Sequence, residues 1–251
     1  MTERSLKRVT PGKSIDLLNA AGRGCTKTVK FLLGRKGIDV NIQNSLGHSP
    51  LHRAVYFGDT KIIKLLLECE GINVNIQDKY GCSPLYRAAH KGYTGVVKLL
   101  LQCEGIDVNI QNKCGYSPLH SAAQNGHTDI VELLLECEGI DVNIQNSVKH
   151  SPLYWAVRNE RTETVKLLLK HGTTVDPKTV AAARDNITFI LTDWKSYLPK
   201  WTLFGRVPGF YPKDFKDIAV AWLLVCNQMG VLPKDLKYLM IEYIAEAWKQ
   251  V

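Results

Sequence analysis

Long apolar segments are missing from this sequence. The first eight residues, Met-Thr-Glu-Arg-Ser-Leu-Lys-Arg, contain no apolar stretch that could act as a signal peptide. The longest apolar run, Ile218 to Cys226, is far shorter than the about 20 residues that a helix needs to cross a bilayer. We therefore expect a protein of the cytoplasm that has no membrane-spanning segment.

The motifs of common enzyme classes are also missing. The sequence has no glycine-rich phosphate-binding loop, no His-Glu-x-x-His zinc motif and no Gly-x-Ser-x-Gly nucleophile elbow. A catalytic set needs side chains that converge on one point, and nothing in the sequence indicates such a set. We expect no catalytic activity and no cofactor.

Cysteine pairs with metal-binding spacing are absent too. Cys69, Cys103 and Cys137 recur at one spacing, and stacked units would hold their sulfur atoms about 10 Å apart, whereas zinc holds each sulfur at about 2.3 Å. The other four cysteines form no Cys-x-x-Cys pair, and the odd total of seven favours free thiols. We expect no metal site.

Acidic residues are fewer than basic ones. The chain has 32 Lys and Arg against 24 Asp and Glu, which gives a formal charge of +8. The excess is spread out, with +3 in residues 1–13 and +3 in residues 177–251. No basic run is interleaved with aromatic residues, so specific binding of nucleic acid is not favoured, whereas attraction to acidic partners stays open.

A four-residue phrase, Ser-Pro-Leu-[His/Tyr], recurs every 34 residues. A segment repeated at a spacing of about 20 to 50 residues is usually one supersecondary unit, which buries its apolar face by stacking on copies of itself. The units are residues 10–43, 44–77, 78–111, 112–145 and 146–176. The first unit lacks the Ser-Pro pair, and the last unit runs one residue short after Lys170. The period predicts a linear stack of five units.

Each unit has the pattern of two short helices. Ser followed by Pro is typical of an N-cap and first helical residue, so Ser49, Ser83, Ser117 and Ser151 are expected to begin the first helices. A glycine suits the positive φ at the end of a helix, and we expect Gly58, Gly92 and Gly126 to end the first helices and Gly71, Gly105 and Gly139 the second.

The fifth unit departs from this glycine pattern. Lys149 stands where the earlier units have Gly47, Gly81 and Gly115, and Glu160 stands where they have Gly58, Gly92 and Gly126. A residue with a Cβ is disfavoured at positive φ. We expect this unit to be locally strained or built differently.

These shared features resemble the ankyrin repeat. The resemblance rests on Gly-x-Ser-Pro-Leu-His-x-Ala, the glycine between the helices, the triple leucine and Gly-Ile-Asp-Val-Asn, and it covers residues 10–176. It implies an all-α solenoid of about five helix-turn-helix units with linking hairpin loops, and the apolar pattern of the residues beyond the repeats adds a C-terminal helical tail. It also implies a non-catalytic scaffold, expected to be a monomer, that binds another protein, and a helix-start hydrogen bond for His52 and His120.

Positions that vary between the copies are the candidate partner-binding residues. Positions held constant build the stack, whereas the variable ones fall on the linking loop and the end of the first helix, which the ankyrin resemblance places on a concave binding face. A variable position can also be merely unconstrained, but aromatic residues there are natural anchors. The candidates are Leu46, His48, Tyr56, Phe57, Tyr80, Cys82, His90, Lys91, Tyr116, Gln124, Asn125, His150 and Arg158.

The period disappears after Asp176. We expect an N-terminal basic extension at residues 1–9, a capping helix and linker at residues 177–210, and a helical hairpin at residues 211–251. The hairpin could simply cap the repeats.

The phrase that begins Leu-Pro-Lys-Asp-Leu near the end of the chain resembles the opening of an F-box. Ankyrin proteins of poxviruses and other large DNA viruses end in a truncated segment of this kind, which implies docking on a Skp-type adaptor of a cullin ubiquitin ligase and, for a viral protein, a place in the host cytoplasm. The candidate docking residues are Leu232, Pro233, Leu236, Leu239 and Ile241.

Overall fold

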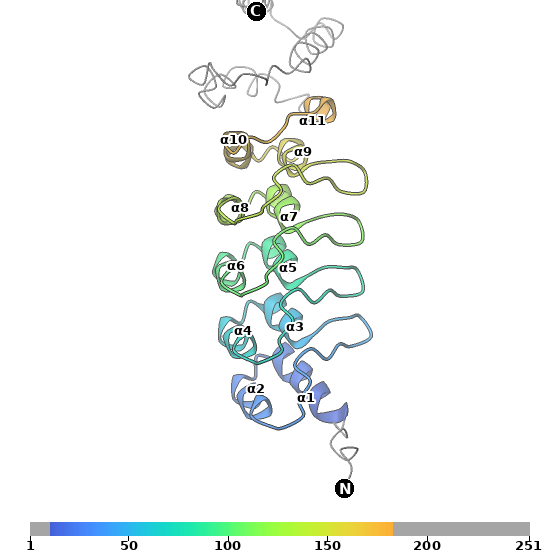
Figure 1. Cartoon of the computed structure of the whole chain (residues 1–251), viewed down its shortest axis with the longest axis vertical. Helices are drawn as coiled ribbons and strands as arrows, with labels where there is room; N and C mark the ends of the chain where they lie inside the picture. Colours follow the sequence, from blue (N-terminus) through green and yellow to red (C-terminus); the bar gives the residue numbers. More distant parts are fainter. Residues whose placement is uncertain (1–10, 183–251) are drawn as a thin grey trace, which may run out of the picture. The chain divides into compact units, whose positions relative to one another are not determined.

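The computed structural model describes residues 11–182, which form a stack of helix pairs (Figure 1). The first helices of the pairs are α1 (Pro11–Gly22), α3 (Pro50–Phe57), α5 (Pro84–Lys91), α7 (Pro118–Asn125) and α9 (Pro152–Arg158). The second helices are α2 (Thr26–Leu33), α4 (Thr60–Leu67), α6 (Thr94–Leu101), α8 (Thr128–Leu135) and α10 (Thr162–Lys170). The described residues contain no strand, so the predicted all-α solenoid is confirmed.

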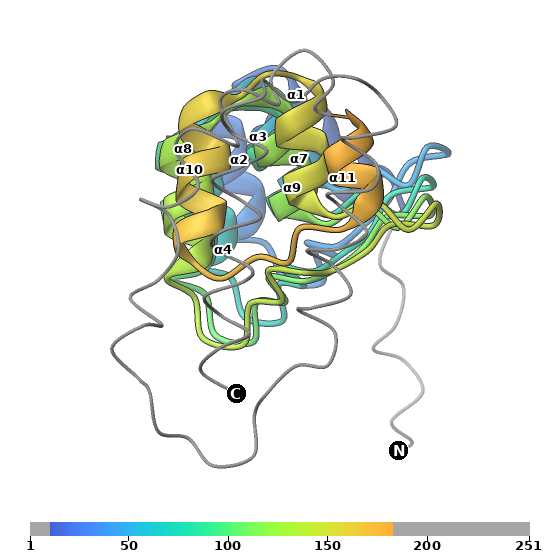
Figure 2. The ribbon, with the colours of Figure 1, turned by 90° about the horizontal axis from the view of Figure 1, so that it is seen from above.

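The two kinds of helix form two parallel rows. Each first helix packs on the first helices before and after it, and each second helix packs on its own neighbours in the same way. Seen along the stack, the first helices lie between the second helices and a set of loops that project from one side (Figure 2). A short helix, α11 (Pro177–Ala182), packs on α9 at the start of the predicted capping helix. The predicted hairpin at residues 211–251 lies outside the described residues.

The first helices begin where the Ser-Pro pairs predict. The hydroxyl oxygen of Ser49 accepts a hydrogen bond from the backbone N–H of His52 at 3.3 Å, and Ser83, Ser117 and Ser151 cap their helices in the same way. Proline follows each serine at the first helical position, where it loses no intrahelical hydrogen bond. The cap prediction is confirmed in all four units.

The ends of the helices agree only in part with the prediction. Gly58 ends α3 in the left-handed conformation with φ of 69°, and Gly92 and Gly126 do the same for α5 and α7. The second helices end earlier than predicted, since α4 stops at Leu67 and Gly71 lies in the turn beyond it with φ of 75°. The backbone N–H of Cys69 bonds to the carbonyl of Leu66 in that turn, so the chain leaves the helix before it reaches the glycine.

The fifth unit carries the predicted backbone strain. Lys149 and Glu160 have φ of 62° and 57°, in the left-handed region that the other units fill with glycine. Helix α9 has seven residues, whereas α3, α5 and α7 have eight. The fold therefore imposes the repeat's backbone path on residues that do not favour it.

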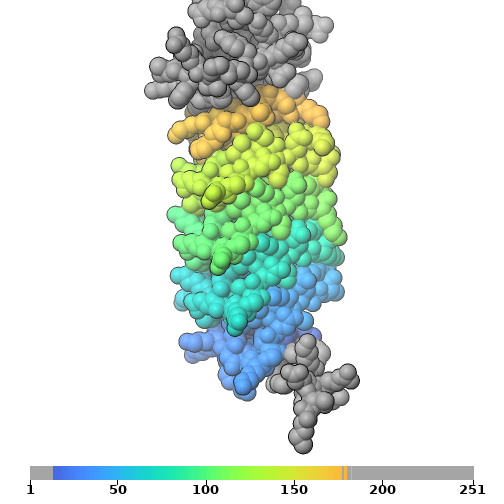
Figure 3. All heavy atoms as spheres, in the orientation of Figure 1, coloured from blue at the N-terminus to red at the C-terminus, as the bar shows by residue number. Residues whose placement is uncertain are grey.

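One continuous apolar core runs through all the pairs. It extends from Leu17 to Leu168, and within one unit Leu51, Ala54 and Ile62 are fully buried. The units follow one another as successive layers along the molecule (Figure 3). Each layer buries its apolar side chains within its own helix pair and against the adjacent layers, so the stack gives every unit the same orientation.

Candidate partner-binding surface

The surface that we call the loop face consists of four hairpin loops and the exposed sides of the first helices that follow them. Its loops are residues 44–48, 78–82, 112–116 and 146–150, and its helices are α3, α5, α7 and α9. Each loop is closed by the side chain at its first position: Oδ1 of Asn44 accepts hydrogen bonds from the backbone N–H groups of Leu46 and His48 at 2.9 and 3.0 Å. This closure gives every loop the same shape.

Hydrogen bonds between neighbouring loops fix their spacing. The backbone N–H of Lys79 donates to the carbonyl of Leu46 at 3.0 Å, and Lys113 bonds to Tyr80 in the same way. Ser147 continues the series with a bond to the carbonyl of Cys114 at 3.1 Å. The loop face is therefore a connected surface, whose side chains are held in rows.

A second set of hydrogen bonds, which we call the asparagine ladder, joins the units behind the loops. Asn75 donates from Nδ2 to the carbonyl of Gly105 at 2.7 Å, while its Oδ1 accepts from the backbone N–H of Asp107 at 2.9 Å. Asn41 and Asn109 make the equivalent pairs of bonds. The asparagine that recurs in register at positions 41, 75 and 109 was a signal in the sequence from which such a ladder could have been predicted.

Most of the predicted partner-binding residues lie on the loop face. Leu46, Tyr56, Phe57 and Tyr80 are large apolar side chains with 39, 49, 54 and 56% exposure. His90, Lys91 and Arg158 are also exposed, and five more are half-buried: His48, Tyr116, Gln124, Asn125 and His150. Cys82 does not belong to the exposed set.

Cys82 is a correction to the predicted surface. Its side chain is 6% exposed, and its backbone carbonyl faces the Nε2 of His52 at 2.9 Å. The small side chain at this position is buried between two loops, whereas the larger side chains of His48 and Tyr116 at the equivalent positions reach the surface. Cys82 therefore contributes to packing between units.

Exposed aromatic rings of the second and third units each lie beside a cation. The Nζ of Lys91 lies 4.7 Å from the ring centre of Tyr56, and the Nζ of Lys79 lies 5.0 Å from that of Tyr80. The guanidinium of Arg53 lies 5.7 Å from the ring of Phe57. Cations at these distances are attracted to the face of the ring, so each pair presents an apolar edge together with a positive charge.

The fourth and fifth units carry an aromatic cluster that the sequence analysis missed in part. Trp155 packs against Tyr116 and Tyr154 with ring centres 5.5 and 5.4 Å apart, and His150 stacks on Tyr154 at 3.6 Å. The guanidinium of Arg158 lies 5.3 Å from the Trp155 ring. Comparison of the copies could have found Trp155, because the same repeat position holds Arg53, Arg87 and Ser121 in the other units.

An ion pair between the buried Asp78 and the half-buried Arg87 fixes the loop of the third unit. Oδ2 of Asp78 accepts a hydrogen bond from Nη2 of Arg87 at 2.6 Å, and Nε2 of His48 lies 3.7 Å from the same oxygen. Burial alone raises the pKa of Asp78, but the hydrogen bonds from Arg87 and from the backbone of Cys82 and Tyr80 outweigh it and hold the pKa below its ordinary value. The carboxylate is thus fully engaged inside the fold.

His52 and His120 stabilise helix starts, as the ankyrin resemblance implies. Nδ1 of His120 accepts from the backbone N–H of Ser117 at 3.2 Å, so its Nε2 carries the proton and donates to the carbonyl of His150 at 2.9 Å. His52 makes the same contacts with Ser49 and Cys82. Both ring nitrogens are occupied, which leaves neither imidazole available as a catalytic base.

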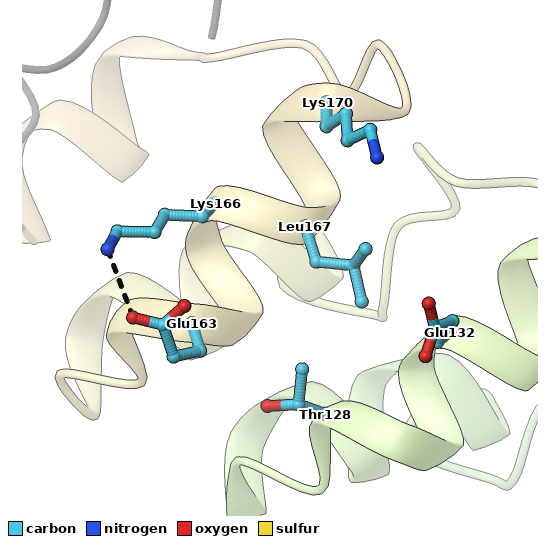
Figure 4. A pocket seen from close by; sticks show the side chains of 6 residues that line it. All are labelled: Thr128, Glu132, Glu163, Lys166, Leu167 and Lys170. Carbon is cyan, nitrogen blue, oxygen red and sulfur yellow. Dashed lines mark hydrogen bonds and ion pairs between the residues drawn. The ribbon is translucent and has the colours of Figure 1, made fainter. Parts of the chain in front are cut away.

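The opposite face carries an open depression between α8 and α10 (Figure 4). Charges of both signs line it, including Glu132, Lys170 and the Lys166–Glu163 ion pair at 3.0 Å. Within residues 11–182, no three His, Cys, Asp or Glu side chains converge in a way that could hold a metal ion. None of the helices described there has the length and apolarity to cross a membrane.

Models of the ankyrin-repeat family match residues 17–112 and 104–179. These matches span most of the stack, and the chain belongs to the ankyrin-repeat family. Repeats of this family form protein–protein interaction modules, and the chain is therefore one that binds another protein. A search of the curated proteins found no match.

Proposed function

We propose that the protein is a non-catalytic scaffold that holds a partner protein on the loop face. The observation that carries this proposal is the distribution of exposed apolar side chains. Of the seven large apolar side chains that are exposed among the described residues, five lie on the loop face: Leu46, Tyr56, Phe57, Tyr80 and Val148. Exposed apolar residues that gather on one face are typical of interaction sites.

The rigidity of the loop face supports the same proposal. Hydrogen bonds between the loops hold Leu46, Tyr80 and Cys114 in register, so little conformational freedom is lost when a partner binds. Tyrosine and tryptophan contribute large contact areas at low entropic cost and dominate binding energy in many interfaces.

The test is a triple substitution, Tyr56→Ala, Tyr80→Ala and Tyr116→Ala, in the full chain. We expect partner capture from a lysate of the source cells to fall by at least about tenfold, since anchor residues each contribute about 1 to 2 kcal/mol or more to binding. Thermal unfolding should change little, because these rings pack outside the buried core.

Phe31→Ala is the matched control. Phe31 is 60% exposed on α2 and has the guanidinium of Arg35 4.4 Å from its ring centre, so it is an aromatic–cation pair on the opposite face. Loss of capture by Phe31→Ala, or full capture by a folded triple variant, would show that the partner does not use the loop face.

A second proposal is that the chain is a substrate adaptor that recruits its target to a cullin-type ubiquitin ligase. It is supported by the F-box-like phrase at Leu232 to Ile241, which lies outside the described residues. Retention of a purified Skp-type adaptor by the full chain, and its loss in Leu236→Ala with Leu239→Ala, are the expected results. An intact chain that retains no adaptor would contradict this proposal and leave the first unaffected.

A further inference from the structure

The loop face carries an excess of basic side chains. In the second to fifth units, the segments made of a loop and a first helix are residues 44–58, 78–92, 112–126 and 146–160. They contain seven basic side chains and only two acidic ones, Asp78 and Glu160; the basic residues are Arg53, Lys79, Arg87, Lys91, Lys113, Lys149 and Arg158.

The two acidic residues offset only a small part of the positive charge of the loop face, since Asp78 pairs with only one of these basic side chains, Arg87. Asp78 is 5% exposed and is bonded to Arg87. Glu160 lies beyond the end of α9, in the turn that leads to α10. The neighbouring Asp59 uses its carboxylate to cap α4 through the backbone N–H groups of Lys61 and Ile62. The loops and the exposed sides of the first helices are therefore basic over four units.

Among the segments that carry the second helices, those of the second to fourth units have the opposite balance. Residues 59–77, 93–111 and 127–145 contain ten acidic side chains and three basic ones, Lys61, Lys64 and Lys98. The formal charge of the whole chain hides this division. Residues 161–176 of the fifth unit contain three basic and two acidic side chains, and residues 23–43 of the first unit contain five basic and one acidic. A field of one sign on one face attracts partners of the other sign and orients their approach.

The cations of the loop face are combined with aromatic rings. Lys91, Arg53 and Lys79 lie 4.7, 5.7 and 5.0 Å from the ring centres of Tyr56, Phe57 and Tyr80 respectively. A carboxylate that approaches such a cation adds a charge-assisted hydrogen bond without disturbing the ring contact. The exposed ring edges remain available for apolar side chains of the same partner.

We propose that the loop face binds an acidic protein segment in which Asp or Glu side chains alternate with apolar ones. This inference rests on the proposed function and names the chemistry of the partner. The apolar residues would contact Leu46, Phe57 and the ring edges, and the carboxylates would pair with Lys79, Lys91 and Lys113. Because the loops are bonded to one another, an extended segment can follow their tips from unit to unit.

Other occupants fit the loop face less well. Nucleobases stack on ring faces, and one face of each of the rings of Tyr56, Phe57 and Tyr80 is already occupied by a cation. The chain's own C-terminal residues 177–251 contain ten basic and seven acidic side chains, so charge does not favour them as an internal ligand. A second copy that offered the acidic second helices of its second to fourth units would make a head-to-tail contact, which builds rings or open chains of molecules.

The experiment measures binding of labelled probes to the full chain by fluorescence anisotropy. The probes are a peptide of alternating Glu and Leu or Phe, the same peptide with Gln in place of Glu, and a single-stranded oligonucleotide of equal length. We expect the acidic peptide to bind most tightly, and its affinity to fall steeply between about 50 and 500 mM NaCl because salt screens exposed charges.

Two charge-reversal variants locate the effect. The first variant reverses the charge of three exposed lysines of the loop face through Lys79→Glu, Lys91→Glu and Lys113→Glu. We expect it to lose at least about tenfold in affinity for the acidic peptide. The second variant makes the same change in net charge on the second helices through Lys61→Glu, Lys64→Glu and Lys98→Glu. Its affinity for the acidic peptide should stay within about twofold of that of the unchanged chain.

Four outcomes would overturn the inference. These are equal binding of the Gln peptide, tighter binding of the oligonucleotide, equal losses in both charge variants, and self-association of the free chain in light scattering that the loop-face variant abolishes. Failure of the proposed function can be distinguished from failure of this inference. If the aromatic triple variant loses its cellular partner while the loop-face charge variant keeps it, the scaffold proposal stands and the acidic-segment inference fails.

Discussion

At the scale of single residues, His120 shows how burial gives a polar side chain one structural task. Its ring is fully buried, and its two nitrogens bond to Ser117 and to the carbonyl of His150. Burial lowers the pKa of His120 to about 4, and the hydrogen bond to His150 only partly opposes this effect. The imidazole is therefore neutral in the folded chain, whereas it takes up a proton near pH 6.5 when the chain unfolds.

This difference predicts that acid destabilises the fold through His120. The pKa of His120 is lower in the folded chain than in the unfolded one. Its contribution to the free energy of unfolding is therefore complete above about pH 6.5 and is lost as the pH falls towards 4. The total loss is roughly 3 kcal/mol. The free energy of unfolding, measured with urea, should therefore differ less between pH 7 and pH 4.5 in His120→Tyr than in the unchanged chain. Tyrosine is chosen because Tyr86 and Tyr154 occupy the same repeat position. A variant with the exposed His171→Tyr serves as the control. An unchanged pH dependence in His120→Tyr would contradict the assignment.

At the scale of helices, the end of α9 stores backbone strain. Glu160 has φ of 57°, where α3, α5 and α7 are followed by glycines. We expect Glu160→Gly to raise the free energy of unfolding by about 1 kcal/mol, because relief of left-handed strain exceeds the entropy that glycine adds to the unfolded chain. Urea unfolding measures the change. Glu160→Ala keeps the Cβ and should give no gain, so an equal gain in both variants would assign the effect to the charge of Glu160 instead.

The bounds of the first helices were predictable from the sequence because each signal acts locally. Ser49 followed by proline determines where α3 begins, and Gly58 determines where it ends, without any information about the rest of the chain. The loop face was less predictable, since it depends on contacts between units. Cys82 is buried by its neighbours, and Trp155 contacts Tyr116, which lies 39 positions earlier in the chain. The excess of basic side chains on the loop face was readable from the sequence only after the loops and helices had been assigned to faces.

At the scale of the whole molecule, the asparagine ladder couples one unit to the next. Each asparagine contributes a donor and an acceptor to the following unit, as Asn75 does to Gly105 and Asp107. The stability of a stack of repeats is approximately the sum of unit terms and neighbour terms. Because the ladder adds only neighbour terms, it helps the units to unfold together.

We therefore expect Asn75→Ala to lower the free energy of unfolding by about 1 to 2 kcal/mol, since two hydrogen bonds between units are lost. The loss should appear mainly as faster amide exchange at the boundary of the second and third units, around Gly105 and Asp107, and as a broader urea transition. Gln102→Ala, which removes an exposed polar side chain of similar size within one unit, is the control and should change neither. If Asn75→Ala lowers stability without broadening the transition or speeding exchange at that boundary, the ladder stabilises each unit by itself and does not couple neighbours.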